Sequence, residues 1–195
     1  MPRPPRVQCP GGIHHVTARG VRRLPIYTSD ADYRLFLDIL GLVAERFGWR
    51  ILAYCLMPNH YHLVIQTPLP NLSEGMHRLN SRYAHAFNDR HGYAGHVFEA
   101  RFGAVFVERT EHLLELVRYV HRNPVRARLC REPGEWAWSS YRALAGKAPA
   151  PPWLAVDEVL ELFEATRPRA RRRLRDFVAD ALEARPPLRP DPRPP

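Results

Sequence analysis

Residues 50–67 read RILAYCLMPNHYHLVIQT, and this stretch decides the fold. It holds two runs rich in apolar and β-branched residues, 50–57 and 60–67, joined by Pro58 and Asn59. Because proline cannot donate to a strand ladder and asparagine tolerates turn geometry, the two runs predict a tight antiparallel hairpin. Strand alternation then places His60 and His62 on one face of the hairpin and Tyr61 on the other.

The flanking segments alternate strand and helix patterns. In chain order, we expect a strand over 12–19, a helix over 30–47, a helix over 71–91, one strand broken near Gly103 within 96–108, and a helix that begins at Thr110. Strand–helix–strand, repeated around the hairpin, is the split βαβ order. The sequence therefore predicts an α+β fold, a ferredoxin-like or RRM-like antiparallel sheet with two helices on one face and a C-terminal helical extension.

Composition shifts suggest how the rest of the chain is organised. We expect a flexible leader over 1–11, the main domain over 12–130, a Trp-containing extension with a Pro-rich linker over 131–154, a basic helix over 155–185, and a disordered Pro/Arg tail over 186–195. Residues 167–195 carry nine Arg and four acidic residues, which is either a solvated surface or a DNA contact. Trp136, Trp138 and Tyr141 fit core packing better than stacking on bases.

Charge favours a nucleic-acid partner. The 195 residues carry a net charge of +9, and every basic residue except Lys147 is arginine, whose fork matches phosphate. The three cysteines, Cys9, Cys55 and Cys130, form no C-x-x-C pair, which predicts a reducing, cytoplasmic setting without disulfides. No apolar run is long enough for a membrane span, and the start lacks the apolar core of a signal peptide.

The His-x-His pattern at 60–62 is the sharpest chemical feature. Two imidazoles on one side of a sheet are close enough to share one divalent ion, although such pairs are also found as ordinary surface residues. His15 faces this site only if its strand neighbours that of His62. The pattern alone favours an ordinary buried histidine with a hydrogen-bond partner at this position.

Tyr119 and Asn123 form a second feature, four residues apart on one face of the helix that begins at Thr110. Two imidazoles and an amide oxygen would leave coordination positions open to polarise a phosphodiester, which the Tyr119 phenol would then attack. The alternative is structural. Tyr119 would be an interface tyrosine, and Asn123 with Pro124 would be the N-cap and first residue of a new short helix.

Several motifs in order resemble the REP-associated tyrosine transposases of the single-tyrosine HUH superfamily, in which the IS200-like transposase domain occurs. They are GIHHVTARG at 12–20, LMPNHYHLVIQ at 56–66, FEARF at 98–102, RYVHRNPVRARL at 118–129 and WAWSSYRA at 136–143. The resemblance implies that His60 and His62 are metal ligands and that Tyr119 is the nucleophile. Asn123 occupies the place of a third ligand that is glutamine in many relatives.

The same resemblance implies Mg²⁺ or Mn²⁺, a single-stranded DNA partner with a palindromic hairpin, a 5′-phosphotyrosine intermediate and a monomer. We therefore expect a transposase-type endonuclease and strand transferase. The alternatives are a domesticated DNA-binding protein without catalysis and a metal-dependent phosphodiesterase that uses water. The arginines expected to contact DNA are Arg19, Arg22, Arg82, Arg101, Arg122 and Arg126, although a solvated surface role is the default for each one singly.

Overall fold

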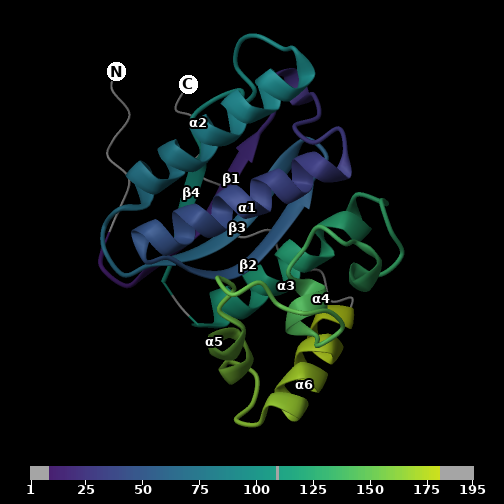
Figure 1. Cartoon of the computed structure of the whole chain (residues 1–195). Coiled ribbons are helices and arrows are strands. Elements are labelled where there is room, and N and C mark those ends of the chain that lie inside the picture. Colours follow the sequence, from purple (N-terminus) through teal and green to yellow (C-terminus); the bar gives the residue numbers. More distant parts are fainter. Residues whose placement is uncertain (1–8, 109, 181–195) are drawn as a thin grey trace, which may run out of the picture.

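The computed structural model describes residues 9–108 and 110–180 of the chain (Figure 1). The elements are β1 Gly12–Arg19, α1 Asp30–Phe47, β2 Arg50–Met57, β3 His60–Thr67, α2 Leu72–His91, β4 Gly103–Val107, α3 Thr110–Arg126, α4 Tyr141–Leu144, α5 Val156–Glu161 and α6 Arg167–Ala179, with short 3-10 turns at Val21–Arg23 and Pro133–Glu135. Within these ranges no helix is long and apolar enough to cross a bilayer.

The four strands form one antiparallel sheet in the order β2-β3-β1-β4. The predicted hairpin is confirmed, with Met57 opposite His60 across the two-residue turn. β1 pairs with β3 along its whole length, so that Thr17 lies opposite His62 and Arg19 opposite His60. This strand order is that of the predicted ferredoxin-like fold.

Alternation along β3 divides the protein into two layers of different character. On one face Tyr61 is fully buried, packs against Phe36 of α1 and donates a hydrogen bond to Asn80 of α2. Helices α1 and α2 run side by side over this face (Figure 1), as predicted. The other face carries His60 and His62 and is covered in part by α3, which the sequence had not assigned to a face.

The extension after α3 packs against the open edge of β2. The backbone N–H of Leu56 donates to the carbonyl of Trp138, that of Ser140 donates to Tyr54, and that of Ala155 donates to Ile51. The Pro-rich segment is therefore fixed along the sheet and does not act as a free linker. Covering this edge removes the unpaired N–H and C=O groups through which edge strands aggregate.

The aromatic residues of the extension belong to the core, in agreement with the packing interpretation. The Trp138 ring stacks on Tyr33 with ring centres 4.5 Å apart, and the Trp136 indole N–H donates to the Leu56 carbonyl. Tyr141 is buried. All three side chains thus face protein groups.

Two expectations about single elements were wrong. The segment 96–108 is not one broken strand, because only Gly103–Val107 pairs in the sheet and Phe98 makes one isolated bridge to Gly20. No short helix begins at Asn123, because α3 continues through Pro124 to Arg126. Pro124 lacks the N–H that would donate to the carbonyl of Val120, and its ring is buried inside the helix. At the end of α3 the carbonyls of Asn123 and Pro124 accept from the N–H groups of Ala127 and Leu129.

The C-terminal region is two helices within its described part, which extends to residue 180. The acidic first turn of α5 and the arginine-rich α6 are separated by residues 162–166. Pro168 occupies the first turn of α6, where its missing N–H costs nothing, and the residue before a proline disfavours helical geometry. One continuous basic helix was therefore the wrong expectation. The leader over 1–8 and the tail beyond 180 lie outside the described residues.

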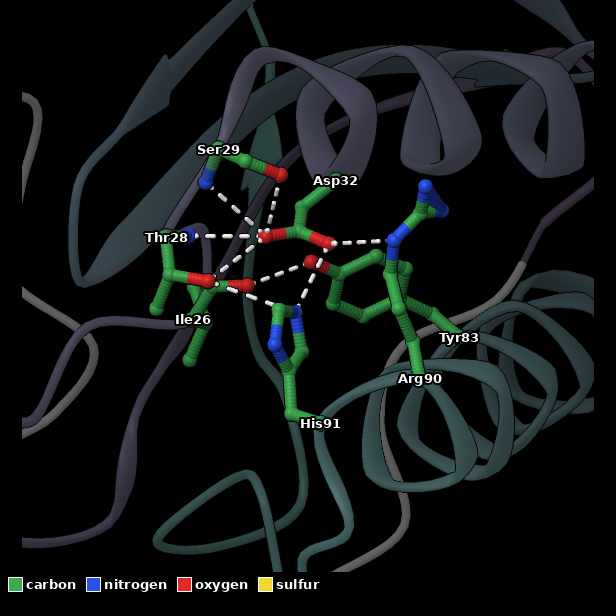
Figure 2. Close-up of polar contacts among 7 residues, drawn as sticks. All are labelled: Ile26, Thr28, Ser29, Asp32, Tyr83, Arg90 and His91. Carbon is green, nitrogen blue, oxygen red and sulfur yellow. Dashed lines mark hydrogen bonds and ion pairs between the residues drawn. The ribbon is translucent and has the colours of Figure 1, made fainter.

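A buried carboxylate joins the start of α1 to the end of α2 (Figure 2). Asp32, which is fully buried, accepts hydrogen bonds from the backbone N–H and hydroxyl groups of Thr28 and Ser29 and pairs with His91 at 3.0 Å and Arg90 at 3.7 Å. Burial alone would raise the pKa of Asp32, but the hydrogen bonds from His91, Thr28 and Ser29 lower it to about 2.

Replacing this carboxylate tests its contribution to stability. We expect Asp32→Asn to lower the free energy of unfolding at pH 7 by about 2 kcal/mol, the value of the pKa shift. A lowered carboxylate pKa stabilises the fold above the unfolded-state value near 4, and this stabilisation is lost as the pH falls through about 2. The difference from wild type in urea unfolding should therefore shrink between pH 5 and pH 2. Asp30→Asn is the control, because Asp30 is exposed and its pair with Arg34 at 3.6 Å is a surface contact. An equal loss in both variants would contradict the assignment.

Candidate active site

Three histidines gather on the sheet face that α3 partly covers. His60 and His62 project from β3 with ring centres 5.1 Å apart, and His15 of β1 stacks on His62 with ring centres 5.2 Å apart. The antiparallel register brings His15 there, because the side chains of His15, Thr17, His60 and His62 share one face of neighbouring strands. His15 is therefore both buried with a hydrogen-bond partner and adjacent to His62.

Hydrogen bonds orient the imidazoles. The Nδ1 atom of His60 lies 2.7 Å from Oδ1 of Asn59, and because an amide oxygen has no proton to give, His60 is the donor. The Nε2 atom of His60 then carries a lone pair. The Nδ1 atom of His62 lies 2.9 Å from Nε2 of His15, while Nε2 of His62 is buried and has no hydrogen-bond partner among the described residues.

The histidine cluster is uncharged at neutral pH. Burial lowers the pKa of His15 to about 4. Burial first, and then the charge of Arg19, lowers the pKa of His60 to about 4. Burial also places the pKa of His62 well below its ordinary value, and the neighbouring His15, His60 and Arg19 lower it further. Neutral imidazole is the form that binds a metal ion.

Tyr119 reaches the cluster from α3. The apolar stripe of this helix is buried, and Tyr119 lies half-buried at its margin, as its helical position predicts. The edge of the Tyr119 ring meets His62, with ring centres 5.5 Å apart, and His15, with ring centres 6.1 Å apart. The guanidinium of Arg126 lies 5.3 Å from the centre of the same ring. Residues more than fifty positions apart in sequence are thus brought together.

Asn123 follows Tyr119 by one helical turn and is also half-buried. Its Nδ2 group donates to the backbone carbonyl of Tyr119 at 3.1 Å. This bond leaves the Oδ1 oxygen as the group that is able to bind a cation. The resemblance implies glutamine at this position in many relatives. Asparagine is shorter, so its amide oxygen extends less far from the helix.

The residues present fit a divalent cation held in part by other ligands. The unpartnered, buried Nε2 of His62 is the kind of atom that a metal ion satisfies. Among residues 9–108 and 110–180 there is no group of three or more His, Cys, Asp or Glu side chains arranged to hold a metal. A bound ion would therefore take two imidazoles and complete its shell with oxygens, from Asn123, water or a phosphate group.

The extension and α6 anchor α3 from its far side. His121 is fully buried, and its Nε2 atom lies 2.8 Å from the hydroxyl of Ser140. Arg122 donates to the carbonyls of Val178 and Ala179 at the end of α6. These contacts give Arg122, an expected DNA ligand, an intramolecular role. Sequence reasoning missed them because nothing in a local pattern tells which distant segment packs on a helix.

The other arginines expected to bind DNA divide into two groups. Arg19 lies opposite His60 at the end of β1, and Arg22 is exposed in the turn that follows. Arg82 is exposed on α2, which covers the opposite face of the sheet, and Arg101 lines a cavity of about 1070 Å³ between α2 and residues 93–102. Arg19, opposite His60, and Arg126, over the Tyr119 ring, lie beside the histidine cluster, whereas Arg82 lies on the helix that covers the opposite face.

The chain is similar to a known protein family in sequence and to a known protein in fold. A family model described as "Transposase IS200 like" matches residues 11–123. The fold resembles a solved structure of a REP-associated tyrosine transposase bound to a REP hairpin, with a TM-score of 0.66 and 20% identity over 80% of this chain and 92% of that chain. No curated protein sequence matches the chain.

Two further solved structures are more distant. One is a chain from Deinococcus radiodurans R1 with a provisional transposase name, at TM-score 0.40 and 18% identity over 66% of this chain and 91% of that chain. The other is the tRNA(His) guanylyltransferase of Saccharomyces cerevisiae, at TM-score 0.47 and 9% identity over 85% of this chain and 76% of that chain. A TM-score below 0.5 does not establish a shared fold, so only the first likeness bears on the architecture.

The electrostatics of the cluster can be measured in the metal-free protein. By ¹⁵N NMR titration, we expect the imidazoles of His15 and His60 to titrate near pH 4. Arg19→Ala should raise the pKa of His60, because a neighbouring positive charge is removed, yet leave it below 6.5, because burial is the larger cause. Arg34→Ala removes an exposed charge from α1 and should change nothing. A His60 pKa of 6.5 in the wild-type chain would contradict the burial of this ring.

Proposed function

The chain belongs to the IS200-like transposase family, and from this premise we propose that it cleaves and rejoins single-stranded DNA at hairpin sites, with Tyr119 as the nucleophile. The observation that supports this most is the contact between the Tyr119 ring and His62, with ring centres 5.5 Å apart. A helix and a central strand converge there to put a phenol beside two neutral imidazoles. A protein that only bound DNA would have no need of this arrangement.

His60, His62 and Asn123 would hold the divalent cation that this reaction requires, Mg²⁺ or Mn²⁺. When bound, the ion supplies positive charge that polarises a phosphodiester. Two nitrogen ligands suit Mn²⁺ somewhat better, because Mg²⁺ prefers oxygen. Asn59 accepts from Nδ1 of His60 and so leaves its Nε2 atom for the cation. His15 would do the same for His62 when Nδ1 of His62 donates to Nε2 of His15.

The chemistry at phosphorus is an exchange of one ester bond for another. The Tyr119 oxygen forms a bond to phosphorus, the bond from phosphorus to the 3′ oxygen breaks, the phenol loses its proton, and the 3′ oxygen gains one. The products are a 5′-phosphotyrosine and a free 3′-hydroxyl. Attack of a 3′-hydroxyl on the adduct reverses the exchange and joins strands, so the number of ester bonds is conserved and no nucleotide cofactor is consumed.

The DNA partner is proposed from the family and from the structural neighbour, whose solved structure holds a REP hairpin. Arg19 lies opposite His60, Arg126 lies over the Tyr119 ring, and Arg22 is exposed in the turn after Arg19, so all three are candidates to contact the DNA phosphates. Helix α3 packs against the sheet of its own chain and is held there by α6. Tyr119 therefore meets the histidines of the same chain, which supports a monomer as the working unit.

Loss of the phenol oxygen tests the nucleophile. Tyr119→Phe should abolish a covalent protein–DNA adduct on a labelled single-stranded hairpin, because no other oxygen occupies that position, while binding of the hairpin stays within a few-fold. The measurement is a denaturing gel with Mn²⁺ or Mg²⁺, and with EDTA as the metal-free sample. The hairpins are palindromes taken from the DNA that flanks the gene.

Tyr93→Phe is the matched control, because Tyr93 is exposed and lies outside the cluster. The adduct should persist in this variant and should not form on a duplex. Cleavage that survives in Tyr119→Phe would instead indicate a phosphodiesterase that uses water. Tight hairpin binding without cleavage by the wild-type chain would indicate a domesticated binder.

Substitutions of Asn123 test whether its side chain binds the cation or only forms a hydrogen bond within α3. Asn123→Ala should weaken Mn²⁺ binding by about tenfold or more, as is typical for loss of a metal-site group, and Asn123→Gln should retain it because the amide oxygen is kept. Isothermal titration with Mn²⁺ measures both. If Asn123→Ala binds Mn²⁺ like wild type, the bond from Asn123 to the Tyr119 carbonyl is its whole role and the ion takes its remaining oxygens from water and DNA.

A further inference from the structure

A turn built from two arginines follows β1 directly. Arg22 and Arg23 both have left-handed backbones, with φ of 53° and 61°, a conformation that non-glycine residues rarely adopt. Gly20 precedes them because a Cβ atom there would lie 2.2 Å from the Leu24 carbonyl oxygen. Both arginines are exposed, as is Arg19 before them. Two successive arginines thus occupy a strained turn from which both side chains reach solvent.

This arginine turn, residues 20–24, is bonded to the hairpin turn that precedes His60. The N–H of Gly20 donates to the Asn59 carbonyl at 2.9 Å, and the N–H of Ile26 donates to the Pro58 carbonyl at 2.9 Å. The side chain of Asn59 completes the connection, because its Nδ2 group donates to the Arg23 carbonyl at 2.9 Å. A displacement of either turn would break bonds to the other.

Asn59 bonds His60 and the arginine turn at the same time. Its Oδ1 accepts from Nδ1 of His60, and its Nδ2 donates to Arg23. The Arg23 carbonyl only accepts, so the Nδ2 end of the amide must face it. The Oδ1 end then faces His60, whose Nδ1 must donate. The side-chain amide of Asn59 thus connects the exposed arginine turn to the ring of His60, a proposed metal ligand.

The charges of the turn are available to an outside partner. Among the described residues, Arg19, Arg22 and Arg23 have no carboxylate within ion-pair distance, whereas Arg34, Arg50, Arg118 and Arg167 do. Exposed guanidinium groups without an internal partner are suited to bidentate contacts with phosphate.

We propose that Asn59 is a positioning residue that couples DNA phosphate binding at Arg22 and Arg23 to the orientation of His60, so that DNA and the divalent cation bind cooperatively. This inference rests on the proposed function. Phosphate contacts hold the arginine turn against the hairpin turn. The turn, through the Arg23 carbonyl, holds the Asn59 amide, and the amide keeps the proton of His60 on Nδ1 and the Nε2 lone pair free for the cation. By linkage, the cation strengthens DNA binding by the same factor.

The experiment measures Mn²⁺ affinity with and without a saturating hairpin oligonucleotide that carries a single-stranded extension. The full chain carries Tyr119→Phe so that the DNA stays intact. In this background we expect the hairpin to raise Mn²⁺ affinity by about 5-fold or more. The quantity of interest is the ratio of the Mn²⁺ affinity with the hairpin to the Mn²⁺ affinity without it. A variant that only binds DNA more weakly leaves this ratio unchanged, because the DNA is saturating.

Two substitutions of Asn59 separate its two bonds. Asn59→Asp keeps an oxygen acceptor for His60 but loses the donor to Arg23. Its added negative charge favours the cation, so Mn²⁺ binding without DNA should be at least as tight as before, while the gain caused by DNA should fall below 2-fold. Asn59→Ala loses both bonds, and Mn²⁺ affinity without DNA should fall by about 10-fold or more. The ¹⁵N shifts of His60 should report loss of the Nδ1–H form in Asn59→Ala alone.

The arginines are tested without disturbing the backbone. The double variant Arg22→Asn with Arg23→Asn removes both charges, and asparagine tolerates left-handed geometry. The dependence of hairpin affinity on salt should become shallower by about 1.4 in the log–log slope, the value of two contacts to a single strand, and the DNA-induced gain in Mn²⁺ affinity should fall below 2-fold. Arg34→Asn with Arg172→Asn removes two exposed charges elsewhere and should retain both the slope and the gain.

Different results would contradict the coupling through Asn59 and the proposed function on which it rests. A chain that binds neither Mn²⁺ nor any hairpin would overturn the proposed function. A chain that binds both with no gain, or that keeps its full gain in Asn59→Asp, would overturn the coupling alone. Unchanged Mn²⁺ affinity and unchanged ¹⁵N shifts in Asn59→Ala would do the same, because His60 would then be oriented by other groups.

Discussion

The antiparallel pairing of β1 with β3 is the interaction on which the rest of the site depends. It fixes Thr17 opposite His62 and Arg19 opposite His60, and thereby sets His15 within hydrogen-bond distance of His62. A slip by one residue would turn His15 toward α1 and α2 and bring the side chain of Val16 to the histidine face. Register is secured from the other face, where Val16, Tyr61 and Leu63 are fully buried under the two helices. The apolar core beneath the two helices thus helps to determine the geometry of a polar cluster on the other face of the sheet.

The two faces of the sheet have separate tasks. Beneath α1 and α2, large aromatic side chains such as Tyr61 and Tyr83 are buried with their hydroxyl groups satisfied, and the Asp32 cluster ties the two helices together (Figure 2). On the opposite face the Nε2 atom of His62 is left unpartnered and burial keeps the histidines neutral. An unsatisfied buried nitrogen is a cost that the fold accepts where a ligand satisfies it.

Helix α3 shows how packing from outside the sheet positions a side chain at the histidine cluster. Tyr119 lies half-buried between the cluster and solvent, while the neighbouring His121 and Arg122 hold the helix to the extension and to α6. The extension itself adds backbone hydrogen bonds along the edge of β2. The C-terminal third of the described chain therefore supports the site from two sides, through α3 and through β2, whose partner strand β3 carries His60 and His62.

The sequence by itself determined the elements and much of the cluster, because strand and helix periodicities are local. The period of two placed His60 and His62 on one face, the Pro58-Asn59 turn set their hairpin, and helical spacing put Tyr119 at the margin of a buried stripe. What depends on distant contacts was decided only by the tertiary structure. His15 meets His62 through strand register, α3 continues through Pro124 with the proline ring buried, and Arg122 turns to the end of α6. For Asn59 the sequence indicated only a place in the turn. Its role as a connection depends on the bond to Arg23, which lies thirty-six residues away in sequence, in addition to the bond to the adjacent His60. Local patterns determine the direction in which a side chain leaves its own backbone. The residues that this side chain contacts depend on how distant segments pack in the folded chain.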